Sequence, residues 1–245
     1  MNLINKKYKN FNLYYYNEIF FEIGKKIIDK KIKIIKDIKN TKRNYVALVE
    51  YDNLKYILKE PRNEFRIPQR KFFTIFKKGE VLSTLVNITK ILDEEKIDNY
   101  ARPFLAIVKR NNLMINYSSL LLEYSRGKEA DNERQKYIPR IIEKMKEIHS
   151  LGYYHGDFKP GNFLIEENNK IIILDTQGKK IGFSNYRAHY DMLTMKMNSY
   201  PEMKYPYKKN CFYYLALIIK KIKKLKFIKK FREKKAELRD KGWKI

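Results

Sequence analysis

Apolar and polar residues alternate through residues 45–60, "YVALVEYDNLKYILKE", in two short runs joined by Asp52 and Asn53. Alternation with a period of two is typical of half-buried strands, and an Asp-Asn link favours a tight hairpin turn. Residues 104–124 predict two more strands, and residues 69–92 between the pairs have the periodicity of a helix. This part of the chain is therefore predicted to be strand-rich, with one helix.

Beyond residue 125 the pattern becomes mostly helical. Residues 132–150 predict a helix, and residues 170–175, "KIIILD", predict a short buried strand that is followed by helices. Strands with one helix, followed by a helical half, predict an α+β chain with two lobes. We divide it into a basic N-terminal extension (1–44), an N-lobe (45–124) and a C-lobe (125–245).

Charge is the strongest feature of the composition. The chain has 54 Lys and Arg against 28 Asp and Glu, a formal net charge of +26. Such a positive charge suits an anionic partner, which could be nucleic acid, an anionic membrane leaflet or a phosphorylated substrate. The alternative is that lysine, isoleucine, asparagine and tyrosine are enriched by a genome rich in A and T. Because Lys greatly outnumbers Arg and no compact nucleic-acid motif is present, we do not expect a nucleic-acid partner.

The single cysteine, Cys211, excludes an internal disulfide, and no apolar run is long enough for a signal peptide or a membrane span. We therefore expect a cytoplasmic protein, soluble or peripheral on a membrane. Residues 1–44 carry 12 basic and 4 acidic groups, and residues 202–245 carry 16 and 4, so both ends are basic.

The basic C-terminal segment predicts an amphipathic helix. Its apolar residues fall at helical spacing: Leu215, Ile218, Ile219, Ile222, Leu225 and Ile228. Lysines lie between them: Lys220, Lys221, Lys223, Lys224 and Lys226. We favour packing of this apolar stripe on the domain over direct membrane docking, and both hold if only part of the stripe is buried.

The stretch "YYHGDFKPGNFLI", residues 153–165, contains His155, Asp157 and Asn162 on a predicted loop, and the next strand ends at Asp175. Two carboxylates and an amide at the ends of adjacent loops suit a hard cation such as Mg²⁺, with one carboxylate left to orient a hydroxyl. Phosphoryl transfer needs mainly such positioning. The cluster therefore favours phosphoryl transfer over a polar loop with incidental carboxylates.

This stretch resembles the catalytic loop of the protein-kinase-like superfamily, His-x-Asp-x-x-x-x-Asn, in the His-Gly-Asp form of its small-molecule branch. The resemblance implies a bilobal fold, ATP and Mg²⁺. It makes Asp157 the catalytic base or hydroxyl-orienting residue, and Lys159 the residue that steadies the transferred phosphate. Asn162 and Asp175 become the metal ligands, and His155 a catalytic-loop residue that fixes the loop.

The same resemblance implies an ATP-binding first lobe. Lys59 resembles the strand lysine that contacts the α- and β-phosphates, with Glu80 on the following helix as its partner. Glu64 is expected in a loop instead, because it follows Lys59 closely and precedes a proline. Glu123 resembles the hinge that pairs with adenine, and Asp191 the aspartate that braces the catalytic loop.

Two departures from the superfamily pattern are present. The stretch before Tyr45 contains no glycine where kinases have a Gly-rich phosphate loop, so Lys42, Arg43 or Asn44 would have to cover the phosphates. Asp175 is followed by Thr176 and Gln177 instead of phenylalanine, and no Ala-Pro-Glu follows. Constitutive kinase activity on a small molecule or glycan is therefore favoured over regulated protein phosphorylation.

The segments "PRNEFRIPQRKF", "GYYHGDFKPGNFLI" and "DTQGK" make the chain most similar to the lipopolysaccharide core heptose(II) kinase family. The resemblance implies ATP-dependent phosphorylation of a heptose hydroxyl in a core glycolipid, at the anionic cytoplasmic face of the inner membrane. Arg62, Arg66 and Arg70 are candidates for contacting the substrate, or are plain surface charges. Another small-molecule or atypical protein kinase stays open, as does a basic pseudokinase that binds membrane or nucleic acid.

Overall fold

The computed structural model describes residues 2–182 and 184–225, and beyond these only the residues 227, 228, 230, 233, 234 and 237. The chain forms two compact units, Met1–Tyr124 and Ser125–Ile245. Both units combine helices with antiparallel strands, which confirms the predicted α+β class. Among the described residues, no helix has the length and apolar character needed to cross a bilayer.

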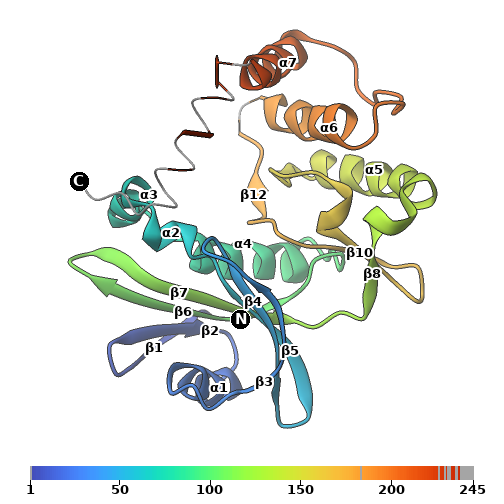
Figure 1. The fold of residues 1–245 in the computed structure, drawn as a ribbon. Helices are drawn as coiled ribbons and strands as arrows, with labels where there is room; N and C mark the ends of the chain where they lie inside the picture. Colours follow the sequence, from blue (N-terminus) through green and yellow to red (C-terminus); the bar gives the residue numbers. More distant parts are fainter. Residues whose placement is uncertain are drawn as a thin grey trace. The chain divides into compact units, whose positions relative to one another are not determined.

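The first unit is built on one antiparallel sheet of seven strands, in the order β1-β2-β6-β7-β5-β4-β3 (Figure 1). The strands are β1 (Ile4–Tyr8), β2 (Phe11–Tyr15), β3 (Lys33–Asn40), β4 (Tyr45–Tyr51), β5 (Leu54–Glu60), β6 (Pro103–Asn111) and β7 (Met114–Glu123). Asp52 and Asn53 link β4 to β5 with φ angles of 51° and 60°. Asp and Asn tolerate this left-handed backbone, so the predicted hairpin is confirmed.

Helices cover both faces of this sheet: α1 (Ile19–Ile28) lies on one side and α4 (Glu80–Glu94) on the other (Figure 1). Successive strand residues point to opposite faces, so neighbours on β6 enter different cores. Leu105 packs in the core that includes α1, and Ala106 in the core that includes α4. Each large buried side chain there contributes roughly 1.5–3 kcal/mol to stability.

The helix predicted over residues 69–92 is interrupted in the structure. Gly79, with φ of +90°, lies directly before α4, and this backbone angle is incompatible with a continuous helix. Shorter elements precede it: α2 (Asn63–Arg66), α3 (Pro68–Phe73) and the 3₁₀ turn η1 (Thr74–Phe76). The sequence pattern merges these pieces because their apolar residues keep a helix-like spacing across the break.

Residues 1–44, expected as an extension ahead of the first lobe, belong to the sheet of that unit. β2 pairs with β6, and β3 pairs with β4 at the opposite edge. Leu13, Tyr15 and Ile23 from this segment are fully buried. The basic composition concealed these positions, because the lysines of this segment lie on β1, α1, β3 and the turns, mostly at exposed positions.

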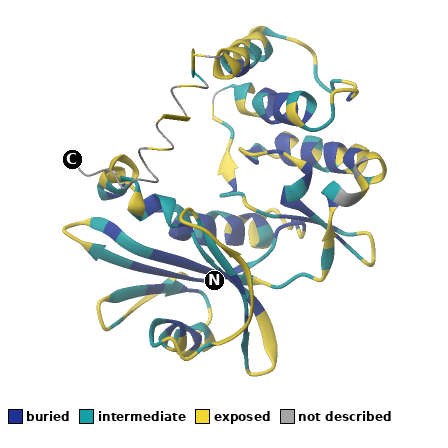
Figure 2. Cartoon of the chain, in the orientation of Figure 1, coloured by how far each residue is buried: buried dark blue, intermediate teal, exposed yellow. Residues whose placement is uncertain are grey.

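In the described part of the second unit, helices are combined with short strands. Its elements are β8 (Gly127–Glu129), η2 (Ala130–Glu133), α5 (Arg134–Ser150), β9 (Tyr153–Tyr154), η3 (Pro160–Asn162), β10 (Phe163–Glu166), β11 (Ile171–Ile173), β12 (Lys179–Lys180), α6 (Tyr186–Asn198) and α7 (Cys211–Lys224). Ile138, Ile141, Met145 and Ile148 are buried at helical spacing on α5. Figure 2 shows this buried face along α5.

The face that α7 turns toward α6 is not the predicted apolar stripe. Ala216 and Lys220 are buried, whereas Leu215, Ile218 and Ile222 are 47%, 53% and 47% exposed. Figure 2 shows mostly exposed residues along α7. The expectation that this stripe packs on the domain is therefore wrong for α7. Lys226 and most residues after it lie outside the described part of the chain.

Candidate active site

The loop that carries His155 and Asp157 runs from β9 through η3 into β10, all within the second unit. Two buried rings anchor it: Phe158 and Phe163 pack edge to face, with ring centroids 5.5 Å apart. Gly156 has φ of +89°, a left-handed angle that turns the chain sharply ahead of Asp157. The apolar anchors and the glycine turn together leave the Asp157 side chain half-exposed.

The Asp157 carboxylate is held on one side by two neighbours. Lys159 Nζ lies 2.7 Å from Asp157 Oδ2, and Asn162 Nδ2 donates to the same oxygen at 3.2 Å. Partial burial raises the pKa of Asp157, but the hydrogen bonds and charge of Lys159, with the Asn162 amide, outweigh it and lower the pKa below 3.8. The side chain is therefore ionised at neutral pH and can accept a hydrogen bond from a hydroxyl.

Asn162 is oriented by its amide nitrogen, which also donates to the Asp157 carbonyl at 2.7 Å. This orientation leaves Asn162 Oδ1 without a hydrogen-bond donor among the residues that the structure describes. No described group of three or more His, Cys, Asp or Glu could hold a metal ion by itself. In phosphoryl-transfer sites Mg²⁺ takes one or two carboxylates together with phosphate oxygens, so an amide oxygen beside Asp175 fits it.

Asp175 follows β11, and backbone bonds bring this segment beside the catalytic loop. Leu174 donates its N–H to the Asn162 carbonyl at 2.9 Å, and Thr176 Oγ1 donates to the His155 carbonyl at 3.2 Å. Asp175 has φ of +54°, an uncommon angle outside glycine that recurs at functional sites. The structure thus brings the segments of Asp157, Asn162 and Asp175 together within one unit.

His155 supports the loop from inside. Its Nδ1 accepts the Asp157 N–H at 3.2 Å, and only 6% of the residue is exposed. Burial lowers the pKa of His155 below 6.5, although the charges of Asp191, Asp157 and Asp175 act in the opposite direction. The ring is therefore neutral at physiological pH, which fits the predicted role in fixing the loop.

Asp191 on α6 braces the same loop, as the sequence predicts. Its fully buried carboxylate accepts the backbone N–H of His155 at 2.7 Å and of Gly156 at 3.0 Å. His149 Nε2 lies 3.4 Å from Asp191 Oδ2, and His149 Nδ1 lies 2.7 Å from the Tyr207 hydroxyl. His149 and Tyr207 were not predicted from the sequence; the available signal was a histidine at the end of α5, shortly before the loop.

In the first unit, Lys59 lies on β5 between Val46 of β4 and Leu120 of β7. Glu80 is the first residue of α4 and lies on a helix, as expected, but its pairing with Lys59 stays a prediction. Glu123 ends β7 and donates its N–H to the Arg102 carbonyl at 2.8 Å. Its predicted role beside adenine also stays a prediction.

Glu64, expected in a loop, is a buried residue of α2. Its carboxylate accepts the Glu80 N–H and, at 2.9 Å, the Ser118 hydroxyl. Burial raises the pKa of Glu64, although these two hydrogen bonds oppose the shift. The sequence did contain a signal for this role of Glu64. Gly79 precedes α4 and has no side chain to cap it, so the first N–H groups of α4 need an acceptor from another part of the chain.

The glycine-free turn between β3 and β4 is held by arginines. Arg62 Nη1 donates to Asn40 Oδ1 and to the Thr41 carbonyl, each at 3.0 Å, and Arg66 donates to the Lys42 carbonyl. Both arginines therefore hold the turn that stands where the superfamily pattern has a Gly-rich loop, and their expected contact with the substrate stays a prediction.

The family model described as "Lipopolysaccharide core biosynthesis protein (WaaY)" matches residues 2–234 of this chain. The chain belongs to this family. The WaaY family comprises lipopolysaccharide core heptose(II) kinases, which are phosphotransferases, so the resemblance inferred from the sequence is confirmed. The match includes both units and the N-terminal strands, whereas the resemblance was traced only from Tyr45 onward.

Protein kinases are also similar to parts of this WaaY-family chain. The Xenopus tropicalis "Hormonally up-regulated neu tumor-associated kinase homolog" is 32% identical over 89 residues, 36% of this chain and 12% of that protein. The Arabidopsis thaliana "CBL-interacting serine/threonine-protein kinase 20" is 41% identical over 51 residues, 21% of this chain and 12% of that protein. The chain thus spans about an eighth of the length of these curated relatives.

Proposed function

We propose that the chain is an ATP-dependent kinase that transfers the γ-phosphoryl group to a heptose hydroxyl of the lipopolysaccharide inner core. Membership of the WaaY family supports this reaction and this acceptor. The observation that carries the proposal is the Asp157 carboxylate, half-exposed and fixed by Lys159 at 2.7 Å. A carboxylate that is held on one side and open on the other suits the orientation of an acceptor hydroxyl.

In this mechanism Asp157 accepts a hydrogen bond from the acceptor hydroxyl and aims its oxygen at the γ-phosphorus. The low pKa of Asp157 suits orientation, because a loose transition state needs little proton removal before the phosphoryl group moves. Lys159 lies beside Asp157 and stabilises negative charge on the transferred group. His155 and Asp191 hold the loop that presents both residues.

The proposed ATP site uses Lys59 and Glu80 for the phosphates and the Glu123 backbone for adenine. Asn162 and Asp175 would hold Mg²⁺ in the second unit. When bound there, Mg²⁺ would neutralise negative charge on the phosphates. Two observations support this assignment: among the described residues the Asn162 side chain bonds through Nδ2, which leaves Oδ1 for a cation, and the backbone at Asp175 is left-handed.

The test is phosphoryl transfer from radiolabelled ATP to purified core oligosaccharide, with a casein-like protein as the alternative acceptor. Asp157→Asn should lower kcat roughly 10²–10⁴-fold. The matched control is Glu167→Gln, an exposed carboxylate in the same unit, and should keep the activity. Preference for the protein acceptor, or full activity of Asp157→Asn, would contradict the proposal.

We further propose that the enzyme works on the anionic inner-membrane surface, as a peripheral cytoplasmic protein. The exposed stripe of α7 includes Ile218 and Ile222, Leu225 follows directly after the helix, and Lys221 and Lys224 are exposed beside them. Apolar side chains flanked by lysines favour binding in the interface of an anionic bilayer.

The first unit has a second surface of this kind on α3 and η1. Phe72, Phe73 and Phe76 are 53%, 47% and 74% exposed, and Lys77 and Lys78 follow directly. Aromatic rings beside basic side chains are typical of segments that lie at the membrane interface.

Sedimentation with vesicles tests this location. Binding should be stronger to vesicles rich in anionic lipid than to neutral ones, and Ile218→Ser with Ile222→Ser should weaken it several-fold. Leu151→Ser removes an equally exposed leucine from the end of α5 and should have no effect. Equal binding of all three proteins would remove α7 from the proposed membrane surface.

A further inference from the structure

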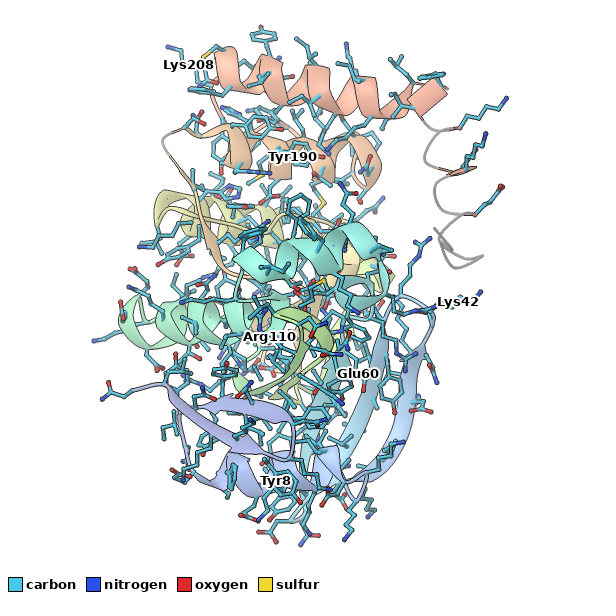
Figure 3. The ribbon with its side chains drawn as sticks, turned by 90° about the vertical axis from the view of Figure 1, so that its left-hand side faces the viewer. Tyr8, Lys42, Glu60, Arg110, Tyr190 and Lys208 are labelled. Atoms are coloured by element: carbon cyan, nitrogen blue, oxygen red, sulfur yellow. The ribbon has the colours of Figure 1, made fainter. Side chains whose placement is uncertain are left out.

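The segment between α6 and α7 places two tyrosine hydroxyls against two histidine rings. Tyr207 Oη lies 2.7 Å from His149 Nδ1, and Tyr205 Oη lies 2.6 Å from His189 Nδ1. Both histidines are buried, with 8% of His149 and 0% of His189 exposed. Lys208, labelled in Figure 3, marks this segment near the start of α7. The two pairs have the same hydrogen-bonding groups and lie within one unit.

The two pairs differ in what lies beyond the histidine. Among the residues that the structure describes, His189 makes no hydrogen bond to Asp191 or to the catalytic loop. His149 Nε2 instead lies 3.4 Å from Asp191 Oδ2, the oxygen that accepts the His155 N–H at 2.7 Å. A chain of polar contacts therefore runs from the Tyr207 hydroxyl through His149 to the carboxylate that braces the catalytic loop.

The direction of each bond in this chain follows from the carboxylate. Asp191 accepts two backbone N–H groups, so its oxygens act as acceptors and His149 Nε2 carries the proton that faces them. His149 Nδ1 is then an acceptor, and the Tyr207 hydroxyl donates to it. Burial and the charge of Asp191 raise the pKa of Tyr207, so this donor keeps its proton. The hydroxyl therefore holds the His149 ring in one neutral tautomer.

Asp191 Oδ2 is shared between two donors at unequal distances. The bond from the His155 N–H is short, at 2.7 Å, whereas His149 Nε2 stays 3.4 Å away while Tyr207 bonds to the opposite nitrogen of the ring. Without the hydroxyl, Nδ1 would be open to a cavity of about 430 Å³ that borders His149 and Tyr207. A proton on Nδ1 would give a cation that attracts the Asp191 carboxylate away from His155. The hydroxyl thus leaves Oδ2 to the loop.

We propose that Tyr207 is a positioning residue of the phosphoryl transfer, because its hydroxyl fixes His149 and thereby leaves Asp191 to hold the catalytic loop. His155 Nδ1 accepts the Asp157 N–H at 3.2 Å, so a displaced His155 displaces Asp157 as well. A small displacement lowers the rate, because the acceptor hydroxyl is then misaligned with the phosphorus. This inference rests on the proposed kinase function for its effect on rate, but the contact chain itself does not.

The contact chain is tested without any activity, by NMR of the full protein labelled with ¹⁵N in its histidine rings. The chain has only three histidines, so few ring signals need to be assigned. In the wild type, His149 should carry its proton on Nε2 alone. In Tyr207→Phe, the Nδ1 signal should move toward that of a protonated nitrogen, and the backbone amide signals of His155 and Gly156 should shift with it. An unchanged Nδ1 signal in Tyr207→Phe would overturn the proposal.

The effect on the reaction is tested against Tyr205→Phe, which removes the same kind of hydroxyl from the neighbouring pair with His189. Tyr207→Phe should lower kcat about tenfold with little change in KM for ATP, whereas Tyr205→Phe should change kcat by less than about twofold. Each variant loses one hydrogen bond to a buried ring, so the midpoint of urea unfolding should fall in both. Equal kcat values for the two variants would show that the Tyr207 hydroxyl supports only the fold.

A further variant, His149→Gln, separates positioning from packing. Glutamine still offers an N–H to Asp191 but has no tautomers, so adding Tyr207→Phe in this background should not lower kcat again. A second loss of similar size would show that Tyr207 acts by another route, and the proposal would be wrong. If the wild-type protein transfers no phosphate to any acceptor, the kinase proposal fails. The NMR result then still decides whether Tyr207 fixes His149.

Discussion

The Asp191 carboxylate accepts the backbone N–H of His155 at 2.7 Å, although the two residues lie on different elements, α6 and the catalytic loop. A second bond from Gly156 at 3.0 Å makes the contact bidentate. The buried end of the loop is therefore fixed by a side chain, while its exposed end carries Asp157.

Asp191→Ala should both destabilise the second unit and impair the reaction. Removing the carboxylate leaves two backbone N–H groups without an acceptor, which costs about 1–3 kcal/mol for a buried donor. The free energy of unfolding in urea measures this loss, and kcat should fall along with it. The exposed Glu167→Gln is the control and should leave both unchanged. If Asp191→Ala kept the free energy of unfolding of the wild type, the two bonds from Asp191 to the loop would not stabilise the protein.

His155 should make stability depend on pH. Because burial lowers the pKa of His155 below 6.5, the unfolded chain takes up the proton first as the pH falls. This group contributes its full stability above pH 6.5, and the contribution is lost as the pH falls from 6.5 toward the lower folded pKa. Urea unfolding at pH values from about 8 to about 5 measures the slope of the free energy of unfolding against pH.

In His155→Asn the slope should be shallower, because asparagine still offers an oxygen acceptor to the Asp157 N–H but does not titrate. Part of the slope should remain, since burial also lowers the pKa of His189. An unchanged slope in His155→Asn would contradict the prediction.

Substitution of Glu64 should mainly lower stability, whereas substitution of Glu80 should mainly weaken ATP binding. Glu64→Ala leaves the Glu80 N–H and the Ser118 hydroxyl without their acceptor, so it should lower the free energy of unfolding by about 1–3 kcal/mol. Glu80→Gln should instead raise KM for ATP with little loss of stability, if Glu80 positions Lys59. Glu94→Ala, at the exposed end of α4, is the control. Loss of ATP binding only in Glu64→Ala would move the predicted role from Glu80 to Glu64.

Arg66→Ala should loosen the turn between β3 and β4. The arginine donates to the Lys42 carbonyl, and without it the turn should become a faster site of trypsin cleavage at Lys42 and Arg43. KM for ATP should rise several-fold if this turn covers the phosphates, while stability changes by less than about 0.5 kcal/mol because the bond is exposed. Arg70→Ala is the matched control, since it removes an exposed arginine from α3. Identical cleavage rates for the wild type, Arg66→Ala and Arg70→Ala would show that Arg66 does not hold this turn.

Local sequence signals predicted the elements well where the backbone itself dictated them. The Asp52–Asn53 hairpin, the strands of residues 104–124 and the helix ending at Ser150 need only periodicity and turn residues. The loop of residues 153–165 was recognised from the spacing of His155, Asp157 and Asn162, and the structure shows that the last two side chains contact each other directly.

Tertiary partners could not be predicted in the same way. Periodicity identified an apolar stripe on α7 but not which face meets α6, and the structure buries Lys220 instead of Ile218. Glu64 was misassigned because its acceptor role depends on Ser118, which is distant in the sequence. Arg62 and Arg66 likewise act through bonds to a turn on another part of the sheet. Such contacts depend on packing, which a single sequence does not encode locally.

The pairing of β2 with β6 joins Asn12 to Val108 and has a consequence for biosynthesis. The β1–β2 hairpin leaves the ribosome early, yet the strand that receives it is made only after α4. An isolated two-stranded hairpin is marginal in water, and an unpaired edge attracts other chains. The nascent first unit therefore passes through a stage with an open edge. Its N-terminal hairpin docks late, which makes this step the natural point for chaperone assistance.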